Sequence, residues 1–150
     1  MARIGIGLVG TGRHGTRYAQ HVLADFPGLR LAGIWRRDQV AAREQAAAWG
    51  CAAFADYRDL LASPAVDAVV VVVPPTLHRD VLAAAAQAGK PVLLEKPAAP
   101  SRADGVAMLE SVRGCGLPVM VAQTLRFNGV VAAVRAARDR IGPIHALRLS

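Results

Sequence analysis

The hydrophobic residues of this chain form short continuous runs that alternate with longer alanine-rich stretches. The strongest run, Ala68–Val73, contains no polar residue, and such continuity predicts a strand buried on both faces, as in the centre of a parallel sheet. Further runs predict strands at residues 3–9, 29–35, 52–54, 91–94 and 118–122. The stretches between them predict helices at residues 13–25, 38–49, 57–62, 77–88 and 102–113. This alternation predicts an α/β fold with a doubly wound parallel sheet, Rossmann-like, with right-handed crossovers.

Polar residues and glycines mark the ends of two of these helices. Asp38 is suited to cap the start of the second helix, and Gly50 follows its last residue, where glycine readily adopts a left-handed conformation. Thr76 is predicted to cap the fourth helix and Gly89 to end it. A last helix is predicted over residues 130–141, with its valines largely on one face.

Composition and charge narrow the class of protein. A chain of 150 residues, 53% of them hydrophobic, suits one domain with a buried core. The net charge of +7 is compatible with a nucleic-acid partner, but the arginines are scattered and aromatic residues are scarce, so we expect none. Cys51 and Cys115 are too few and too far apart for a metal site or a disulfide framework, which favours a reduced, cytoplasmic protein. No apolar run approaches the ~20 residues of a membrane span.

The segment Gly10–Gly15, with the sequence Gly-Thr-Gly-Arg-His-Gly, joins the first strand to the first helix. This context is typical of a loop that binds the pyrophosphate of a dinucleotide. Gly10 permits the tight turn, Gly12 lets the backbone approach the phosphates, and Gly15 lets helix and strand pack closely. The N–H groups at the helix start favour an anion. The alternative is a glycine-rich turn in another α/β protein. The predicted cofactor contacts are Gly10, Thr11, Gly12, Arg13, His14 and Gly15.

The end of the second strand carries information about the cofactor, because ligands of open α/β sheets bind beyond the carboxyl ends of the strands. An acidic residue there binds the adenine ribose of NAD, whereas an arginine favours the 2′-phosphate of NADP. Arg36 and Arg37 occupy this place. Charge-assisted hydrogen bonds to phosphate are strong, so we expect NADP in preference to NAD. The alternative is that both arginines lie on the surface at the start of a helix.

Lys96 follows another predicted strand, between Glu95 and Pro97. A lysine at a strand end can lose its charge in a desolvated cleft or donate to a developing alkoxide, so Lys96 is the candidate for acid–base catalysis. Taken alone, such a lysine is more often a solvated cation or a phosphate contact. His78, in the first turn of its helix, is a further candidate cofactor contact, although taken alone it is more often a surface residue. We expect no metal site.

Four segments together resemble the N-terminal half of the Gfo/Idh/MocA family, which includes glucose–fructose oxidoreductase and inositol dehydrogenase. These segments are Gly10–Gly15, Asp67–His78, Ala88–Pro97 and Gln123–Phe127. Their joint order and spacing are more specific than any one motif. The resemblance implies an NAD(P)-dependent oxidoreductase that transfers hydride between nicotinamide and a hydroxyl or carbonyl group of a sugar, cyclitol or related polyol.

The resemblance also implies roles for single residues. Gly10–Gly15 would hold the pyrophosphate. Glu95 and Lys96 would lie beside the nicotinamide, with Lys96 on the hydroxyl or carbonyl group of the substrate. Arg126 would be a further contact near a domain junction. The residues implied to line the cofactor groove are Pro74, Pro75 and His78.

Two departures from the family pattern affect these expectations. Many members have an acidic residue at the position of Arg36, which counts against NAD here. Members also continue into a second α/β domain that supplies most of the substrate pocket and much of the oligomer interface. We expect a dinucleotide-binding domain at residues 1–123. Residues 124–150 would be a connecting helix and the first strand, Ile144–Ser150, of a missing C-terminal domain, with a homo-oligomer in the full-length form. The alternatives are a non-catalytic NAD(P)-binding module or regulator, and a basic nucleic-acid-binding domain.

Overall fold

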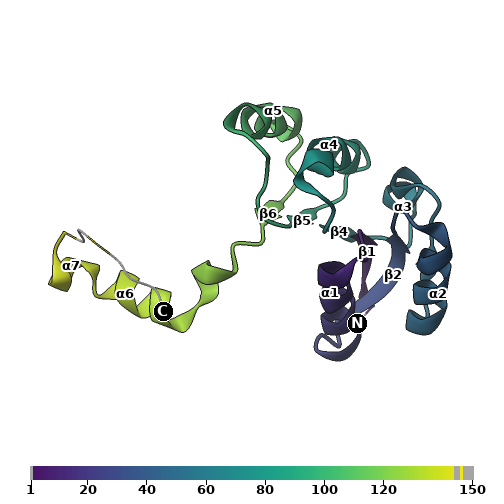
Figure 1. Ribbon diagram of the computed structural model, residues 1–150, viewed down its shortest axis with the longest axis horizontal. Coiled ribbons are helices and arrows are strands. Elements are labelled where there is room, and N and C mark those ends of the chain that lie inside the picture. The colour runs from purple at the N-terminus through teal and green to yellow at the C-terminus, as the bar shows by residue number, and fades with distance from the viewer. Residues whose placement is uncertain (1, 144–145, 147–150) are drawn as a thin grey trace.

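Within residues 2–143 and 146, which the computed structural model describes, six strands form one sheet. They are β1 (Ile4–Val9), β2 (Leu29–Trp35), β3 (Ala52–Ala53), β4 (Ala68–Val71), β5 (Val92–Leu94) and β6 (Val119–Val121). The strand order is β3-β2-β1-β4-β5-β6, so the direction of winding reverses between β1 and β4 (Figure 1). All neighbouring strands are parallel. The doubly wound, Rossmann-like sheet predicted from the strand–helix alternation is confirmed.

Helices pack on both faces of this sheet. One face carries α1 (Arg13–Ala24) and α2 (Gln39–Trp49), and the other carries α3 (Tyr57–Ala62), α4 (His78–Gln87) and α5 (Arg102–Val112). In the central strand β4, Val69 and Val71 join the core beneath α3, α4 and α5, whereas Val70 joins the core beneath α1 and α2. All three valines are buried. The continuous valine run is thus buried on both faces, as its pattern predicts.

The ends of α2 follow the local signals, and the start of α4 does not. The Asp38 carboxylate accepts hydrogen bonds from two backbone N–H groups of the first turn of α2, and Gly50 ends the helix with φ +67°, both as predicted. Before α4 comes a 3-10 turn, η1 (Pro75–Leu77), so Thr76 lies inside that turn and does not cap the helix. The prediction for Thr76 is wrong, because Pro75 fixes a helix-like φ one residue earlier and starts the turn there.

Two predicted bounds near the ends of elements also change. β4 ends at Val71, two residues earlier than the valine run, because the chain then turns toward η1. The single helix predicted over residues 130–141 is two helices, α6 (Gly129–Ala136) and α7 (Arg138–Ile141). At Ala137 the backbone N–H is shared between two carbonyl groups of α6, which tightens the last turn and ends the helix. The predicted strand Ile144–Ser150 lies outside the described residues, apart from Ala146.

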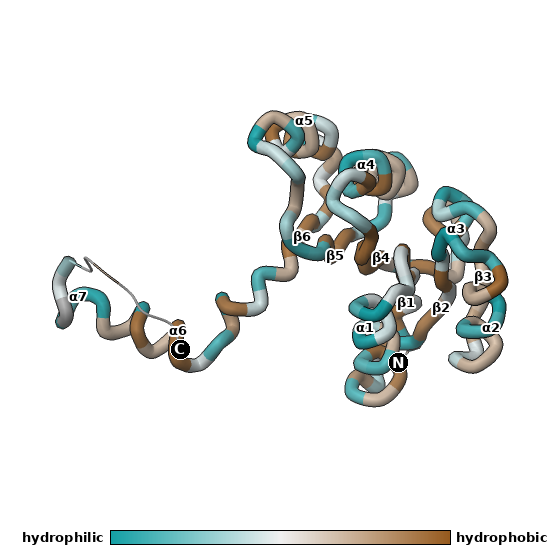
Figure 2. The backbone as a smooth tube through the Cα atoms, viewed as in Figure 1, coloured by the Kyte–Doolittle hydropathy of each residue, from teal (hydrophilic) through white to brown (hydrophobic). Residues whose placement is uncertain are grey.

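The chain after β6 leads away from the sheet. A second 3-10 turn, η2 (Thr124–Phe127), connects β6 to α6, and α6 and α7 form an arm set apart from the other helices (Figure 1). Figure 2 shows that the arm mixes apolar with polar residues. Phe127 in η2 and Val130 in α6 are both exposed. In the described part of the chain, no helix combines the length and the apolar character needed to cross a bilayer.

Candidate functional site

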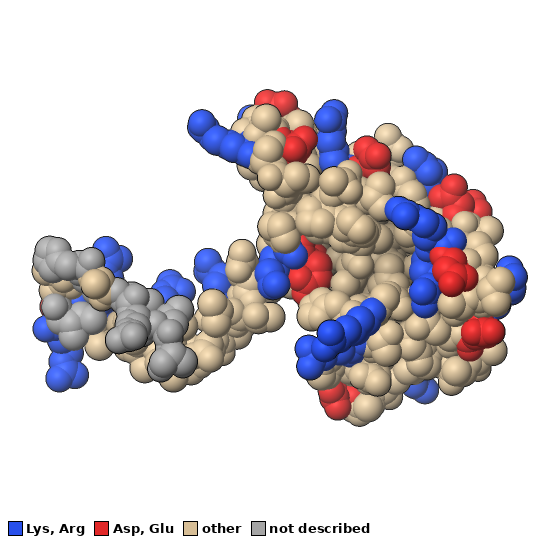
Figure 3. All heavy atoms as spheres, viewed as in Figure 1, with Lys and Arg blue, Asp and Glu red and all other residues tan. Residues whose placement is uncertain are grey.

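A groove of about 400 Å³ lies beyond the carboxyl ends of β1, β2 and β4, at the point where the winding of the sheet reverses. This is where open α/β sheets bind their ligands. The face drawn in Figure 3 is hollowed beside the sheet, with basic side chains on its rim. The groove is lined by Gly10, Thr11, Gly12, Trp35, Arg36, Arg37, Asp38, Val72, Val73, Pro74 and Leu77.

The three glycines of the loop after β1 meet different surroundings. Gly10 has φ +99°, and an added Cβ would collide with the carbonyl oxygen of Val72. A Cβ on Gly15 would collide with the carbonyl oxygen of Gly10. A Cβ on Gly12 would meet no heavy atom within 4 Å, although Gly12 lines the groove. Gly10 and Gly15 are therefore required by the fold itself, whereas the space beside Gly12 is open toward the groove.

The start of α1 presents its backbone to the groove. Gly12 is the N-cap residue, and in the described part of the chain no side chain caps this helix. The N–H groups of the first turn and the positive end of the helix dipole therefore favour an anion beside Gly12. Arg13 and His14 follow in this first turn and are exposed, at the place predicted for pyrophosphate contacts.

The end of β2 supplies positive charge. Arg36 is half-buried and Arg37 is exposed, and both line the groove. Within residues 2–143 and 146 neither forms an ion pair, since the carboxylate of the adjacent Asp38 accepts hydrogen bonds from the start of α2. Two cations without an acidic partner suit a phosphate group.

Glu95, directly after β5, lies at the centre of a hydrogen-bond network. Only 6% of Glu95 is exposed. Its Oε1 accepts hydrogen bonds from His14 Nε2 and from the Tyr18 hydroxyl, both at 2.8 Å, and its Oε2 accepts one from the backbone N–H of Lys96, also at 2.8 Å. The network ties the glycine-loop helix α1 to the segment that carries Lys96.

The network shifts the ionisation of two of its members. Burial disfavours the charged form of Glu95, but the hydrogen bonds from Tyr18, His14 and Lys96 outweigh burial and lower the pKa of Glu95 below its ordinary value. Burial, followed by the hydrogen bond and the charge of Glu95, raises the pKa of Tyr18 to about 12. Glu95 is therefore an ionised acceptor and Tyr18 a neutral donor at neutral pH.

This arrangement predicts the pH dependence of a Glu95→Gln variant. The ionised carboxylate stabilises the fold above the unfolded pKa of about 4.3, and this contribution is lost as the pH falls through the lower folded pKa. At pH 7 the variant should lose about 1–3 kcal/mol of unfolding free energy, because an amide cannot accept from all three donors. Urea unfolding at neutral and acidic pH measures both effects.

The difference in the free energy of unfolding between the wild type and Glu95→Gln should become smaller as the pH is lowered. Glu44→Gln is the matched control, because Glu44 is exposed on α2 and should unfold in parallel with the wild type. If this difference in unfolding free energy were the same at all pH values, ionised Glu95 would not stabilise the fold.

Lys96 lies two residues after the end of β5 and is exposed. The peptide bond between Lys96 and Pro97 is cis. The backbone of Lys96 is held by Glu95, whereas within residues 2–143 and 146 its amino group forms no ion pair. The structure thus brings Lys96 and Glu95 to the same edge of the sheet as the glycine loop.

His78 is fully buried, with 0% of it exposed, so the interpretation of His78 as a surface residue is wrong. Its Nε2 lies 2.9 Å from the carbonyl oxygen of Val73, and its Nδ1 lies 3.0 Å from that of Ala98. His78 therefore joins the loop after β4 to the loop after β5. A local pattern does not reveal this, because Ala98 is 20 residues away. Direct contact of His78 with a cofactor stays a prediction.

The remaining predicted residues divide between the groove and other places. Pro74 lines the groove, whereas Pro75 lines a neighbouring depression between α4 and α5. Arg126 is exposed in η2. Their contacts with a cofactor also stay predictions. Sequence reasoning did not single out Tyr18, although its spacing of four residues from His14 on a helix is a usable signal.

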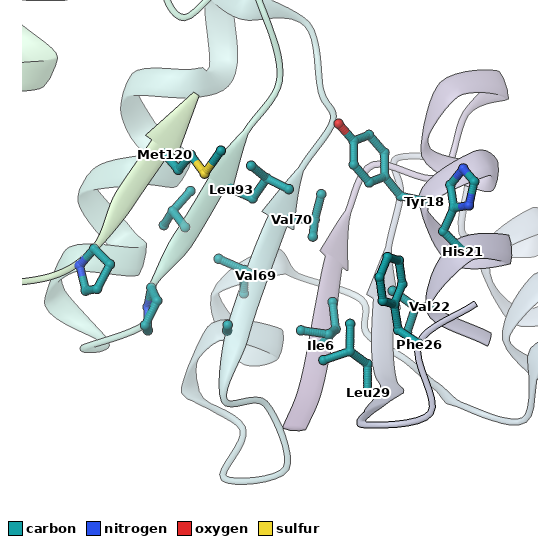
Figure 4. Close-up of a pocket in the computed structure, with 14 residues that line it drawn as sticks. Ile6, Tyr18, His21, Val22, Phe26, Leu29, Val69, Val70, Leu93 and Met120 are labelled. Carbon is teal, nitrogen blue, oxygen red and sulfur yellow. The ribbon is translucent and has the colours of Figure 1, made fainter. Parts of the chain in front are cut away.

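A larger cavity, of about 540 Å³, lies on the sheet face that α1 and α2 cover only in part. Figure 4 shows Val70, Leu93 and Met120 along this open face, with Tyr18 and Phe26 at one side. Its lining is almost entirely hydrocarbon, and the glycine loop does not border it. Of these two hollows, the smaller groove is the one that combines the backbone N–H groups of a helix start with cations.

Comparison with known proteins gives matches over most of the chain. The model of an oxidoreductase family with an NAD-binding Rossmann fold matches residues 4–123. An inositol 2-dehydrogenase of Leifsonia xyli subsp. xyli is 34% identical over 134 residues, which are 89% of this chain and 39% of the relative. The scyllo-inositol 2-dehydrogenase (NAD(+)) of Bacillus subtilis is 29% identical over 88% of this chain and 39% of the relative.

A solved structure agrees with these matches. The NAD binding oxidoreductase from Klebsiella pneumoniae has a TM-score of 0.78 and 32% identity, over 93% of this chain and 39% of that one. The chain thus spans 39% of the length of each of these three proteins. The family match runs from the start of β1 to just after β6, and so includes the glycine loop, both arginines and Lys96. The chain belongs to the Gfo/Idh/MocA oxidoreductase family.

Proposed function

We propose that this chain is the dinucleotide-binding portion of an NAD(P)-dependent oxidoreductase that acts on a hydroxyl or carbonyl group of a sugar, cyclitol or related polyol. The observation that carries the proposal is the groove at the switch point of the sheet, which is lined by an open glycine loop and two cations. Glu95 is tied to the helix that follows this loop through its hydrogen bond with His14. The inositol dehydrogenases among the relatives support the substrate class.

The groove fits a dinucleotide at each of its parts. The space beside Gly12 and the start of α1 would hold the pyrophosphate, and the groove wall formed by Trp35, Val72 and Leu77 would receive the adenosine. A bound nicotinamide supplies the hydride chemistry. The chain would orient that ring near Lys96, and orientation accounts for much of the rate of such a transfer.

Lys96 is proposed as the acid–base group. Its amino group would donate a hydrogen bond to the substrate oxygen, and would give or take the proton that accompanies hydride transfer. Glu95 would hold the backbone of Lys96 in place while hydrogen bonds from His14 and Tyr18 stabilise its carboxylate. In this arrangement the role of the Glu95 carboxylate is to fix the position of Lys96.

NADP is the proposed cofactor, supported by Arg36 and Arg37 at the groove. The Bacillus subtilis relative is named for NAD(+), so this assignment sets the chain apart from that relative. The net charge of +7 adds a general attraction for a ligand with an additional phosphate.

We also propose a cytoplasmic location, a homo-oligomeric full-length form, and residues 124–150 as the connection to a substrate domain.

Replacement of Arg36 by aspartate should reverse the cofactor preference. The change removes a cation that would face the 2′-phosphate and provides a carboxylate for the ribose hydroxyl groups of NADH. The ratio of the dissociation constants of NADH and NADPH, from fluorescence titration, should fall by roughly 100-fold, as expected for loss of a charge-assisted contact. Arg43→Asp is the control, because Arg43 is exposed on α2 and the change in net charge is identical. An equal fall in both variants, or equal affinities in the wild type, would contradict the assignment.

The activity itself is tested by following reduced nicotinamide with myo-inositol and scyllo-inositol in the presence of NADP⁺ or NAD⁺. Turnover of a polyol would support the oxidoreductase. Tight binding of NADPH without turnover of any sugar or cyclitol would favour the non-catalytic module. Failure to bind either dinucleotide would reject both.

A further inference from the structure

Gln45 on α2 connects the two parts of the groove that would hold phosphate groups. The hydroxyl of Thr11, in the glycine loop, donates a hydrogen bond to Gln45 Oε1 at 2.6 Å. Arg36 Nη1 donates to the same oxygen at 3.2 Å, and Gln45 Nε2 donates to the carbonyl oxygen of Thr11 at 3.2 Å. Thr11 is 1% exposed and Gln45 is half-buried, so the contacts are shielded from bulk water.

The partners determine the orientation of the Gln45 amide. A guanidinium has only donors, so the atom of the amide that faces Arg36 must be the oxygen. A backbone carbonyl oxygen can only accept a hydrogen bond, so the amide atom that faces the carbonyl of Thr11 must be the nitrogen. Both requirements select the same orientation, and the hydroxyl of Thr11 adapts to it as a donor.

Gln45 restricts the guanidinium of Arg36 at one nitrogen. An arginine carries five N–H donors, and one bond to Gln45 leaves the others available on the groove side. The backbone of Arg36 is held as well, because Gln39 Nε2 donates to its carbonyl oxygen at 2.8 Å. Arg36 is thus held before any ligand arrives, and ligand binding costs less side-chain entropy than it would with a freely rotating arginine.

We propose that Gln45 is a positioning residue for selection of the 2′-phosphate, and that it acts through Arg36. The inference rests on the proposed NADP preference. The positioning role predicts a selective effect on binding. A residue that merely supports the glycine loop would weaken the binding of every adenine nucleotide equally, because all of them would contact the same loop. A residue that positions Arg36 would weaken mainly the ligand that carries the 2′-phosphate.

The test compares 2′,5′-ADP with 5′-AMP by calorimetry on the 150-residue chain. These probes differ only in the 2′-phosphate. Gln45→Met keeps the length of the side chain and removes the three contacts. It should lower the ratio of the 5′-AMP to the 2′,5′-ADP dissociation constant by about three- to tenfold, the effect expected for releasing one ordered side chain. Gln20→Met, exposed on α1, is the matched control and should leave the ratio unchanged.

A double variant identifies the route of the effect. If Gln45 acts through Arg36, then Arg36→Met with Gln45→Met should have the same ratio as Arg36→Met alone. Circular dichroism confirms that each variant is folded, and Gln45→Asn, whose shorter amide cannot reach both partners, replaces Gln45→Met if the latter does not fold.

The outcomes separate this inference from the proposed function. An unchanged ratio in Gln45→Met, or a further fall in the double variant, would overturn the positioning role while the NADP preference of the wild type stands. A wild-type ratio near one would overturn the NADP assignment, and the inference with it.

Discussion

Replacement of Gly15 by alanine is expected to destabilise the fold by about 3 kcal/mol, because the new methyl group would collide with the backbone carbonyl of Gly10. A flexible side chain can rotate away from such a collision, but a backbone oxygen in a tight turn cannot. The thermal midpoint should fall by roughly 10 °C for a chain of this size. Circular dichroism during heating measures the change.

Gly12→Ala is the matched substitution. It adds the same methyl group to the same loop, but no heavy atom lies within 4 Å of the added group. Its backbone has φ −67°, which alanine readily adopts. We expect the thermal midpoint to change by only a few degrees, since alanine is a somewhat poorer N-cap than glycine. The dissociation constant of NADPH should rise at least about tenfold, because the methyl group occupies the space proposed for the pyrophosphate.

The two variants together separate the requirements of the fold from those of the ligand. Equal losses of stability in Gly12→Ala and Gly15→Ala would show that Gly12 also serves the fold. Unchanged NADPH affinity in Gly12→Ala would place the pyrophosphate elsewhere.

Replacement of Lys96 by alanine is expected to depress turnover by about 10²- to 10⁴-fold, the usual contribution of a general acid–base group. The dissociation constant of NADPH should stay within about twofold, because Lys96 is proposed to act on the substrate oxygen. Steady-state kinetics with a polyol substrate, together with a fluorescence titration of NADPH, measure the two quantities separately.

Lys90→Ala is the control for this prediction, because Lys90 is the other lysine of the chain. Its Nζ donates to the carbonyl oxygens of Ser63 and Val66, away from the groove. Its loss should lower stability and leave turnover per folded molecule unchanged. Comparable losses of turnover and of NADPH affinity in Lys96→Ala would mean that Lys96 serves mainly in binding.

Local sequence patterns predict most of the elements because their causes are local. The valine run of β4 is hydrophobic on both faces, and Asp38 and Gly50 carry the conformational preferences that start and end α2. The exception at α4 is also local, since Pro75 competes with Thr76 for the start of the turn. In each case the deciding residues lie within one turn of the boundary.

The contacts of the candidate site are harder to predict, because their partners are distant along the chain. Tyr18 and Glu95 are 77 residues apart, and Thr11 and Gln45 are 34 apart. The fold class places such residues at one edge of the sheet, but it does not specify which side chains meet there. The burial of His78 is hidden from the sequence for the same reason, because only the folded chain brings the carbonyl of Ala98 to it.

The central position of β1 has a consequence for the synthesis of the protein. β1 pairs with β2 on one side and with β4 on the other, and the contact between Gly5 and Asp67 spans 62 residues. At a translation rate of about 5–20 residues per second, one edge of β1 waits roughly 3–12 s for its partner to leave the ribosome. β1, the earliest of the six described strands along the chain, therefore completes its pairing only when four of those strands have been synthesised.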